Sequence, residues 1–205
     1  MDKIILIGGG GHCTSCIDVI EQENRFQIGG IVDLPDKIGE KQLGYPIIGR
    51  DEDLPRLSET YTFFLITLGQ IKTPQRRIAL YDLLLELQVS LPTVVSPRAY
   101  ISPHAHINDG TIIMHNALVN AGATVGANCI INSCAIIEHD ARIGDHCHIS
   151  TNAVVNGGAI IAGESFVGSG AVIRDNIRVG RRSLIGGGAN VMEDVPEDTF
   201  YTGRK

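Results

Sequence analysis

The sequence has no tryptophan, and only 5% of its 205 residues are aromatic. A core of large aromatic rings is therefore excluded, so small and branched side chains must fill the interior. The sequence also lacks the run of about 18 apolar residues that a transmembrane helix requires. The apolar stretch behind Met1 is too short for a secretory signal. These absences predict a cytoplasmic protein that is not inserted into a membrane.

The sequence also has no excess of positive charge. It contains 17 Lys and Arg and 23 Asp and Glu, which gives a net charge of -6. This balance argues against a nucleic-acid partner. The five cysteines are an odd number without a secretory signal, which favours free thiols in a reducing compartment. Cys13 and Cys16 form an isolated C-x-x-C motif, and no further ligands recur at the spacing of a zinc site. We therefore predict no metal site.

The sequence is rich in glycine, with 24 residues, and its second half repeats with a period of six. Every sixth position from 101 to 191 is a β-branched residue: Ile101, Ile107, Ile113, Val119, Val125, Ile131, Ile137, Ile143, Ile149, Val155, Ile161, Val167, Ile173, Val179, Ile185 and Val191. The residues two positions earlier are small from Ala99 to Ala189, with Ile177 as the exception. So long an uninterrupted pattern predicts a repeat architecture.

The physical form of the repeat follows from its period. Residues two apart on a strand face the same side, so each repeat turns one branched and one small side chain inward. Three repeats make one triangular coil, and equivalent residues then stack 18 positions apart. A helix of 3.6 residues per turn does not match the period, and glycine and β-branched residues are poor helix formers. The repeat therefore predicts a parallel β-solenoid of about five coils, spaced about 4.8 Å apart.

The first half of the sequence alternates strand and helix patterns. We expect strands over 3–7, 27–32 and 62–68, helices over 13–22 and 74–88, and mostly loop over 34–50. Such alternation implies a small parallel sheet, here a Rossmann-like α/β subdomain. Pro92 and Pro97 mark the change of pattern. We therefore predict an α/β domain of residues 1–92 and a β-helix of residues 93–205.

Four glycines, Gly8 to Gly11, stand before His12 where the first strand should turn into the first helix. Backbone N–H groups at such a turn can hold a phosphate or a sugar oxygen. The run is not a dinucleotide fingerprint, because Cys13 occupies the third glycine position and the domain is too short for a six-stranded Rossmann sheet. A tight turn without a ligand is the alternative.

The two halves together resemble one bacterial enzyme family. The glycine turn that ends in His12, the hexapeptide repeats and the segment Ile137-Glu138-His139-Asp140 are similar to those of the nucleotide-amino-sugar acetyltransferases of bacillosamine synthesis. The sialic acid O-acetyltransferases share the same two-domain plan. The resemblance covers nearly the whole chain. It implies a left-handed β-helix, a homotrimer that binds acetyl-CoA between neighbouring β-helices, and a nucleotide-sugar substrate in the N-terminal domain.

The resemblance also implies substrate contacts at the glycine turn and at two strand ends. In this sequence those positions are Gly8, Gly10, Gly11, His12, Asp33, Gly69 and Gln70. Gln70 departs from the family, which has Asn there, so the Gly69 backbone is the safer contact. The C-terminal segment from Tyr201 to Lys205 departs from the family's G-V-P-A-K, and no adenine contact is carried over to it.

Acetyl transfer to an amine needs a base for the proton and donors for the oxyanion. The resemblance assigns the base to His139 and the orienting acid to Asp140. It assigns the polarisation of the acetyl carbonyl to the backbone N–H of Gly157, and it places an outward-pointing His148 near the thioester. His139 and Gly157 are 18 positions apart, so they should stack in adjacent coils. The alternatives are solvated histidines and a corner glycine.

Arginines gather in the last repeats and suit the phosphates of coenzyme A: Arg174, Arg178, Arg181 and Arg182. A solvated basic patch is the alternative. We therefore predict an acetyl-CoA-dependent N-acetyltransferase that acts by direct attack on the amino group of a UDP- or GDP-linked 4-amino sugar. Two rivals are O-acetylation of a sialic-acid-like sugar and a non-catalytic β-helix used for assembly or ligand sensing.

Overall fold

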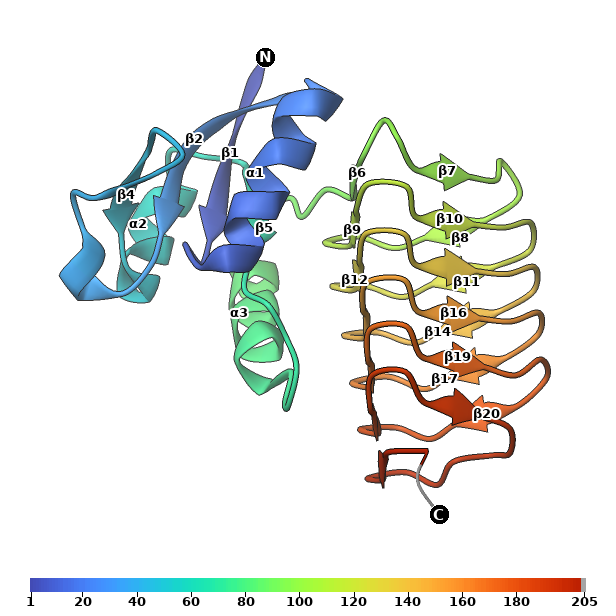
Figure 1. Cartoon of the computed structure of the whole chain (residues 1–205). Coiled ribbons are helices and arrows are strands. Elements are labelled where there is room, and N and C mark those ends of the chain that lie inside the picture. The colour runs from blue at the N-terminus through green and yellow to red at the C-terminus, as the bar shows by residue number, and fades with distance from the viewer. Residues whose placement is uncertain (204–205) are drawn as a thin grey trace.

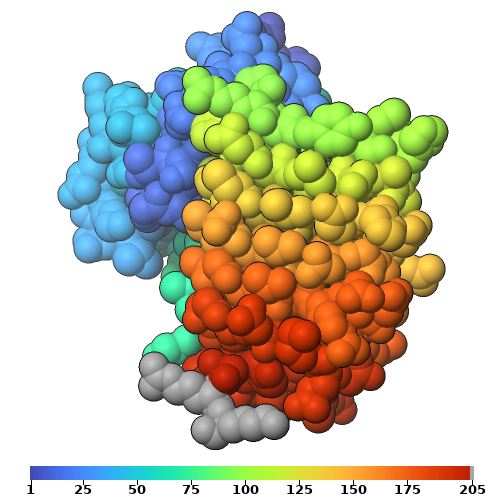
Figure 2. All heavy atoms as spheres, turned by 45° about the vertical axis from the view of Figure 1, so that its right-hand side comes forward, coloured from blue at the N-terminus to red at the C-terminus, as the bar shows by residue number. Residues whose placement is uncertain are grey.

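The computed structural model describes residues 1–203 and shows an α/β domain beside a left-handed parallel β-helix (Figure 1). The N-terminal domain lies against one side of the β-helix, near its first coils, as both views show (Figures 1 and 2). Among residues 1–203, none of the helices has the length and apolar character that a bilayer crossing demands.

The N-terminal sheet has five strands in the order β3-β4-β2-β1-β5. Their bounds are β1 (Asp2–Ile7), β2 (Phe26–Val32), β3 (Lys41–Gln42), β4 (Tyr45–Gly49) and β5 (Phe63–Ile66). The four strands other than β3 run parallel, as the alternating pattern predicts. The prediction of a mostly loop segment over 34–50 is wrong. Pro46 is tolerated near the start of β4 because the pairing of this strand with β2 begins only at Ile47.

Helices cover both faces of this sheet. They are α1 (Gly11–Glu23), α2 (Leu54–Ser58) and α3 (Gln75–Glu86), with two short 3₁₀ turns, η1 (Pro35–Lys37) and η2 (Asp51–Asp53). The first helix packs with Ile4 and Leu6 and also with the β-helix, so it fills the layer between the two parts. The other two helices pack with Ile5 and Ile7 on the opposite face. The predicted helices thus form, within a few residues of their expected ends.

Three parallel sheets form the walls of the β-helix. The first holds β7 (Tyr100–Ile101), β10 (Leu118–Val119), β13 (Ile136–Ile137), β16 (Val154–Val155), β19 (Val172–Ile173) and β22 (Asn190–Val191). The second holds β8 (His106–Ile107), β11 (Thr124–Val125), β14 (Arg142–Ile143), β17 (Ile160–Ile161) and β20 (Arg178–Val179). The third holds β6 (Val94–Val95), β9 (Ile112–Ile113), β12 (Ile130–Ile131), β15 (His148–Ile149), β18 (Phe166–Val167), β21 (Leu184–Ile185) and β23 (Phe200–Tyr201).

The period of six produces the core as predicted. Ile137 pairs with Val155 in the next coil, 18 residues on, and the same register holds along the helix. The branched residues are buried from Ile113 onward, and the small residues two positions earlier are buried with them. Only Ile101 and Ile107 of the branched series are partly exposed, because no earlier coil covers them. Stacking of identical coils therefore supplies a core without large aromatic rings.

The three corners of the triangular coil use left-handed backbone conformations at every sixth residue. Asn, Asp and Gly occupy most of these positions: Gly110, Asn116, Gly122, Asn128, Asp140, Asn152, Gly158, Gly170, Asn176 and Gly188. These residue types adopt positive φ with least strain. The functional residues of the β-helix sit on or beside these corners.

The N-terminal domain covers the third sheet. Ile112, Met114 and Ile130 face outward from that sheet and pack in one apolar cluster with the first helix. His139 lies on the corner between the first and second sheets, after β13 and before β14. That corner is the one that does not border the covered sheet. In Figure 1 it lies on the right-hand edge, away from the N-terminal domain.

Candidate active site

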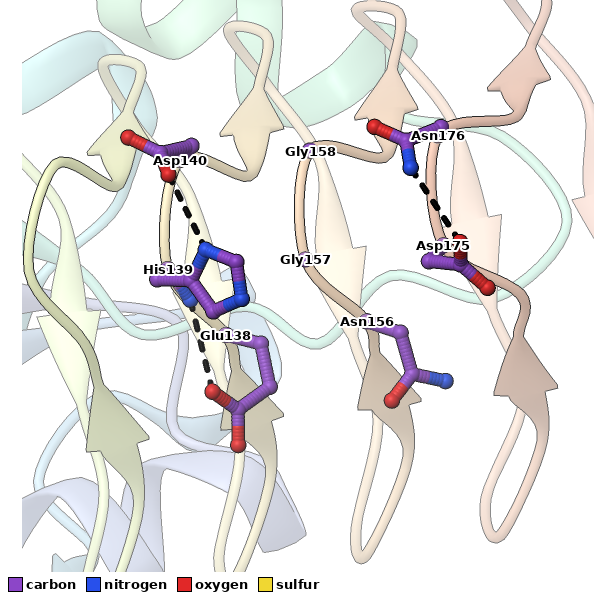
Figure 3. Close-up of a pocket in the computed structure, with 8 residues that line it drawn as sticks. All are labelled: Glu138, His139, Asp140, Asn156, Gly157, Gly158, Asp175 and Asn176. Atoms are coloured by element: carbon purple, nitrogen blue, oxygen red, sulfur yellow. Dashed lines mark hydrogen bonds and ion pairs between the residues drawn. The ribbon is translucent and has the colours of Figure 1, made fainter.

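The corner that carries His139 borders an open groove of about 560 Å³. Three neighbouring coils line it, and the residues from each coil repeat at intervals of 18 (Figure 3). They are Glu138, His139 and Asp140, then Asn156, Gly157 and Gly158, then Asp175 and Asn176. The groove thus brings together three residues that the sequence singled out. The other lining residues occupy the same corner in adjacent coils, at the same 18-residue spacing.

His139 and Asp140 form a hydrogen-bonded pair. His139 Nδ1 lies 2.9 Å from Asp140 Oδ2, which leaves Nε2 directed into the groove (Figure 3). Both side chains are exposed, at 64% and 72%. The hydrogen bond to Asp140 raises the pKa of His139, because the carboxylate favours the imidazolium. The acid therefore fixes the tautomer and strengthens His139 as a base.

Glu138 lies on the other side of the histidine. Its Oε2 accepts hydrogen bonds from Asn120 Nδ2 at 2.8 Å and from the backbone N–H of His139 at 3.4 Å. Glu138 therefore holds the backbone of the corner, while Asp140 holds the ring. The carboxylates of Glu138, Asp140 and Asp175 make the groove acidic, so it suits an amine better than a phosphate.

Gly157 stacks on His139 one coil further on. A Cβ atom built on Gly157 would lie 2.6 Å from His139 Nε2, so only glycine leaves room for the ring in this position. The residue does not have a positive φ, so its identity is explained by this close approach and not by backbone strain. Its backbone N–H has no acceptor within residues 1–203, since the Asn156 side chain donates to Ile173 O instead.

The glycine turn divides into structural and open positions. Gly8 has φ +103, and a Cβ there would lie 2.4 Å from Leu68 Cδ2, so a tight turn alone explains it. A Cβ on Gly10 or Gly11 would meet no atom within 4 Å. Gly10 is the N-cap of α1 without a side-chain cap, and the first turn carries no acidic residue. The first N–H groups of α1 are thus free to bind an anion.

His12 lies beside this helix terminus with an unsatisfied nitrogen. Its Nε2 is buried and has no hydrogen-bond partner within residues 1–203. Burial, together with the nearby Arg77 and His148, lowers the pKa of His12 to about 3. The imidazole is therefore neutral, and Nε2 is available to a ligand or to water.

Asp33 and Gly69 lie near the same turn. Asp33 follows β2 and pairs with Lys37 Nζ at 2.9 Å, and its carboxylate packs against Gly9. A Cβ on Gly69 would lie 3.6 Å from His12 Cβ, so Gly69 borders the histidine. The structure thus brings the predicted substrate residues Gly10, Gly11, His12, Asp33 and Gly69 to one end of the N-terminal sheet.

The side chain of Gln70 lies between the two domains, and its contact with the substrate stays a prediction. Gln70 is only 3% exposed, and its Nε2 donates to His146 O at 2.9 Å. The side chain therefore joins the N-terminal domain to the β-helix. Its Oε1 is buried without a partner within residues 1–203.

His148 also lies between the two domains. The side chain points out of its coil as predicted, but the N-terminal domain covers it and leaves 6% exposed. His148 Nδ1 lies 2.5 Å from Gln70 O, and its Nε2 lies 3.1 Å from Asn132 Nδ2. Burial lowers the pKa of His148 to about 4. His148 does not line the groove of His139 in this chain, and its assignment to acetyl-CoA stays a prediction.

The four arginines expected to bind coenzyme A do not converge. Arg181 pairs with Glu164, and Arg182 makes two hydrogen bonds of 2.6 Å to Asp198. Arg174 follows β19, whereas Arg178 lies on β20 in another sheet. Arg178 and Arg181 nevertheless line one pocket, and the assignment of these arginines to coenzyme A stays a prediction.

A second histidine–acid pair lies between the two domains. His115 Nε2 is 2.7 Å from Asp18 Oδ2, and His115 Nδ1 is 2.6 Å from Ser96 Oγ. The hydrogen-bonded series Ser96–His115–Asp18 resembles the catalytic triad of serine hydrolases. Ser96 is only 1% exposed, however, so no substrate can reach its hydroxyl. The triad-like contact therefore joins the domains.

Cys13 and Cys16 are buried in α1, where burial raises the pKa of both thiols, to about 11 for Cys13. Both thiols therefore stay protonated and pack in the core between the sheet and the β-helix. Within residues 1–203, no three His, Cys, Asp or Glu side chains gather in a way that could hold a metal ion.

Comparison with known families and structures agrees with this two-part architecture. Residues 3–81 match the PglD N-terminal domain family, and residues 122–157 match the bacterial transferase hexapeptide family of six repeats. A search of curated protein sequences gave no match. WeeI from Acinetobacter baumannii, 21% identical, shares the fold, with a TM-score of 0.83 over 98% of this chain and 97% of that chain.

Two other solved structures are more similar in sequence. PerB from Caulobacter crescentus, in complex with CoA and GDP-perosamine, is 28% identical over 97% of this chain and 92% of that chain, with a TM-score of 0.90. The acetyltransferase domain of PglB from Neisseria gonorrhoeae, in complex with acetyl coenzyme A, is 30% identical over 96% of this chain and 94% of that chain, with a TM-score of 0.87. The chain is therefore an acyltransferase and belongs to the hexapeptide-repeat family of nucleotide-amino-sugar acetyltransferases.

Proposed function

We propose that the protein transfers the acetyl group of acetyl-CoA to the amino group of a UDP- or GDP-linked 4-amino sugar. The observation that carries the proposal is the His139–Asp140 pair, which directs Nε2 over Gly157 into an open acidic groove. The similarity to an acetyl-CoA complex and to a GDP-perosamine complex supports the two substrates.

Direct transfer assigns a role to each part of the pair. The neutral amine attacks the thioester carbonyl, and His139 Nε2 takes the proton from the nitrogen as the C–N bond forms. Asp140 stabilises the imidazolium that results. The free N–H of Gly157 donates to the oxyanion. The C–S bond then breaks, and the imidazolium returns the proton to the thiolate of coenzyme A.

The diphosphate of the nucleotide-sugar fits the N-terminal domain. The uncapped N-terminus of α1, with open space at Gly10 and Gly11, offers free N–H groups and the positive end of the helix dipole. His12 Nε2 supplies a further polar atom without a partner. Asp33 follows β2, at the same edge of the sheet as the glycine turn after β1, where nucleotides bind in related α/β sheets.

The positions of the two half-sites favour a homotrimer. The N-terminal domain covers the third sheet of its own β-helix, whereas His139 lies on the corner between the other two sheets. A sugar held by this domain therefore meets the His139 of a neighbouring copy more readily than that of its own chain. A closed ring of three copies gives three such sites, and the acetyl-CoA would lie between neighbouring β-helices.

A thiol-release assay with a panel of substrates tests the proposal. We expect acetyl-CoA turnover with UDP- or GDP-linked 4-amino sugars, and none with free sialic acids. Loss of the base in His139→Ala should lower the rate by about 10²–10⁴. Turnover only with a sialic acid would favour O-acetylation, and no turnover with any sugar would favour a non-catalytic β-helix.

A further inference from the structure

One arginine of the N-terminal domain is buried against the β-helix. Arg77 in α3 is only 2% exposed and makes no ion pair within residues 1–203. Its Nη1 donates to the carbonyls of Ile66 and Leu68, at 2.9 and 2.7 Å. These carbonyls belong to the end of β5 and to the loop that carries Gly69. Burying a charge costs free energy of folding, which only well-placed hydrogen bonds can offset.

The other nitrogen of the same guanidinium binds a corner of the β-helix. Arg77 Nη2 donates to Asn128 Oδ1 at 2.6 Å and to Asn128 O at 3.2 Å. Asn128 is fully buried, and its Nδ2 lies 3.3 Å from Arg77 O and 3.0 Å from His146 Nδ1. One planar group therefore ties the substrate-binding end of the N-terminal sheet directly to the β-helix.

Further contacts surround this connection. Tyr81, one turn after Arg77, packs edge-on against His146 with ring centroids 5.4 Å apart. Gln70 bonds His146 and His148 from the loop after β5. At the opposite edge of the third sheet of the β-helix, the Asp18 carboxylate in α1 is hydrogen-bonded to His115. The N-terminal domain is thus held at both corners that border the third sheet, which fixes its orientation.

We propose that Arg77 and Asn128 form a positioning clamp for acetyl transfer, which sets the angle at which the N-terminal domain presents its nucleotide-sugar to the acetyl-CoA site. The inference rests on the proposed function. The clamp touches neither substrate, so it acts through the Gly69 loop and the domain orientation. Since the sugar must meet His139 on another copy, a small rotation of the domain displaces the amine from the thioester.

The variant Asn128→Gly tests the clamp. Glycine keeps the left-handed corner, where Asn128 has φ 52, but it removes the side-chain acceptor of Arg77. We expect kcat to fall about tenfold to a hundredfold, because a misplacement of about 1 Å can have that effect. The Kd for the nucleotide-sugar, measured by calorimetry without acetyl-CoA, should change less than twofold, since the Arg77 bonds to Ile66 and Leu68 remain.

The matched control is Asn152→Gly. Asn152 occupies an equivalent corner with φ 57, and its exposed side chain has no hydrogen bond within residues 1–203. This control should retain normal kcat. The variant Asn128→Asp keeps the acceptor of Arg77 in a conformation that Asp140 also adopts, with φ 60, but loses the donor to Arg77 O, so its kcat should lie between those of Asn128→Gly and wild type.

Two results would overturn the clamp. One is equal kcat in Asn128→Gly and Asn152→Gly with folded trimers. The other is a fall in nucleotide-sugar affinity as large as the fall in kcat/KM, which would make Asn128 part of the binding site. Inactivity of the wild-type chain with every sugar of the panel instead refutes the proposed function, and the clamp with it. Faster amide exchange over residues 67–73 in Asn128→Gly alone should accompany the kinetic result.

Discussion

At the residue scale, the catalytic corner uses its turn geometry for chemistry. Asp140 occupies a left-handed position, φ 60, where most coils of this β-helix have Asn or Gly. The turn therefore accepts a carboxylate without a change of backbone, and that carboxylate reaches His139 Nδ1. The next coil contributes Gly157, whose lack of a side chain makes space for the ring. The base, orienting acid and oxyanion donor that we propose thus come from two stacked corners.

The exchange Asp140→Asn should shift the pH dependence of the reaction without loss of folding. Asn occupies the same kind of corner at Asn116, Asn128, Asn152 and Asn176. The Asp140 carboxylate raises the pKa of His139, so its removal lowers that pKa, and His139 stays neutral to a more acidic pH. The acid limb of kcat/KM should therefore move to lower pH. The plateau rate should fall, but less than in His139→Ala, because a weaker base remains.

The substrate amine also titrates, so the measurement must separate the two groups. We expect the substrate amine to contribute the same acid limb to the kcat/KM profiles of wild type and Asp140→Asn, because the pKa of the amine belongs to the free substrate. The difference between the two kcat/KM profiles, with substrate Kd measured over the same pH range, isolates His139. An unchanged acid limb in Asp140→Asn would show that another group is the base.

The exchange Gly157→Ala should abolish turnover in a folded protein. The new Cβ would lie 2.6 Å from His139 Nε2 and would push the ring from its position. We expect a loss approaching the 10²–10⁴ of a missing general base. The backbone of Gly157 accepts alanine, so the melting temperature should change little. Gly187→Ala, at an equivalent corner with its nearest contact at 3.3 Å, serves as the control and should remain active.

At the element scale, periodic features could be predicted from the sequence. The sixfold spacing of Ile and Val gives the three sheets and their register, because every coil repeats the same local packing. The sixfold series of Asn, Asp and Gly at the corners was equally visible in the sequence and marks the positive φ values. Strand β4 could not be predicted from Pro46 and the glycines around it, because its pairing depends on β2 and β3.

Contacts between the two domains could not be predicted in the same way. Gln70 and His148 are 78 residues apart, and Arg77 and Asn128 are 51 apart. Nothing in local pattern indicates that such residues meet. The outward direction of His148 followed from its place before Ile149, but its burial depends on the domain that covers it. The pairs of Arg181 and Arg182 differ from these, because their acidic partners are 17 and 16 residues away, in the adjacent coil.

The exchange Gly10→Asp should separate stability from substrate binding in α1. Gly10 is an extended N-cap with φ -81 and ψ -170, a conformation that suits Asp. An aspartate cap should stabilise the helix by about a few tenths of a kcal/mol relative to glycine. Its negative charge would occupy the open space where we place the diphosphate, and would repel it.

Two measurements check this variant. The melting temperature should stay equal or rise slightly, while the Kd for the nucleotide-sugar should increase at least tenfold. The KM for acetyl-CoA should not change, because we place its site on the β-helix. Normal nucleotide-sugar affinity in Gly10→Asp would place the diphosphate elsewhere. Thr60→Asp adds the same negative charge at an exposed position after α2, so it controls for the change in overall charge.

At the scale of the whole molecule, the two half-sites of one chain lie on different sides of the β-helix. The substrate end of the N-terminal domain is fixed beside the third sheet by Arg77–Asn128 and Gln70–His146. The base lies on the corner between the first and second sheets. This rigid connection holds the acceptor sugar away from the His139 of its own chain. It is useful only when another copy supplies the base. The proposed trimer and the proposed clamp are therefore parts of the same arrangement.

Complementation between two inactive variants tests this arrangement directly. Chains with His139→Ala keep the nucleotide-sugar half-site, and chains with Gly10→Asp keep the base. At a nucleotide-sugar concentration well below the raised Kd of Gly10→Asp, each homotrimer should keep only a small fraction of wild-type turnover. In trimers assembled at random from equal amounts, about one site in four combines an intact domain with an intact His139 from its neighbour, so about a quarter of wild-type activity should return. Sedimentation should give a species of three times 22.0 kDa for each variant and for the mixture. If co-expressed variants form mixed trimers that stay inactive, the domain and the base act within one chain; a monomer of 22.0 kDa with full activity leads to the same conclusion.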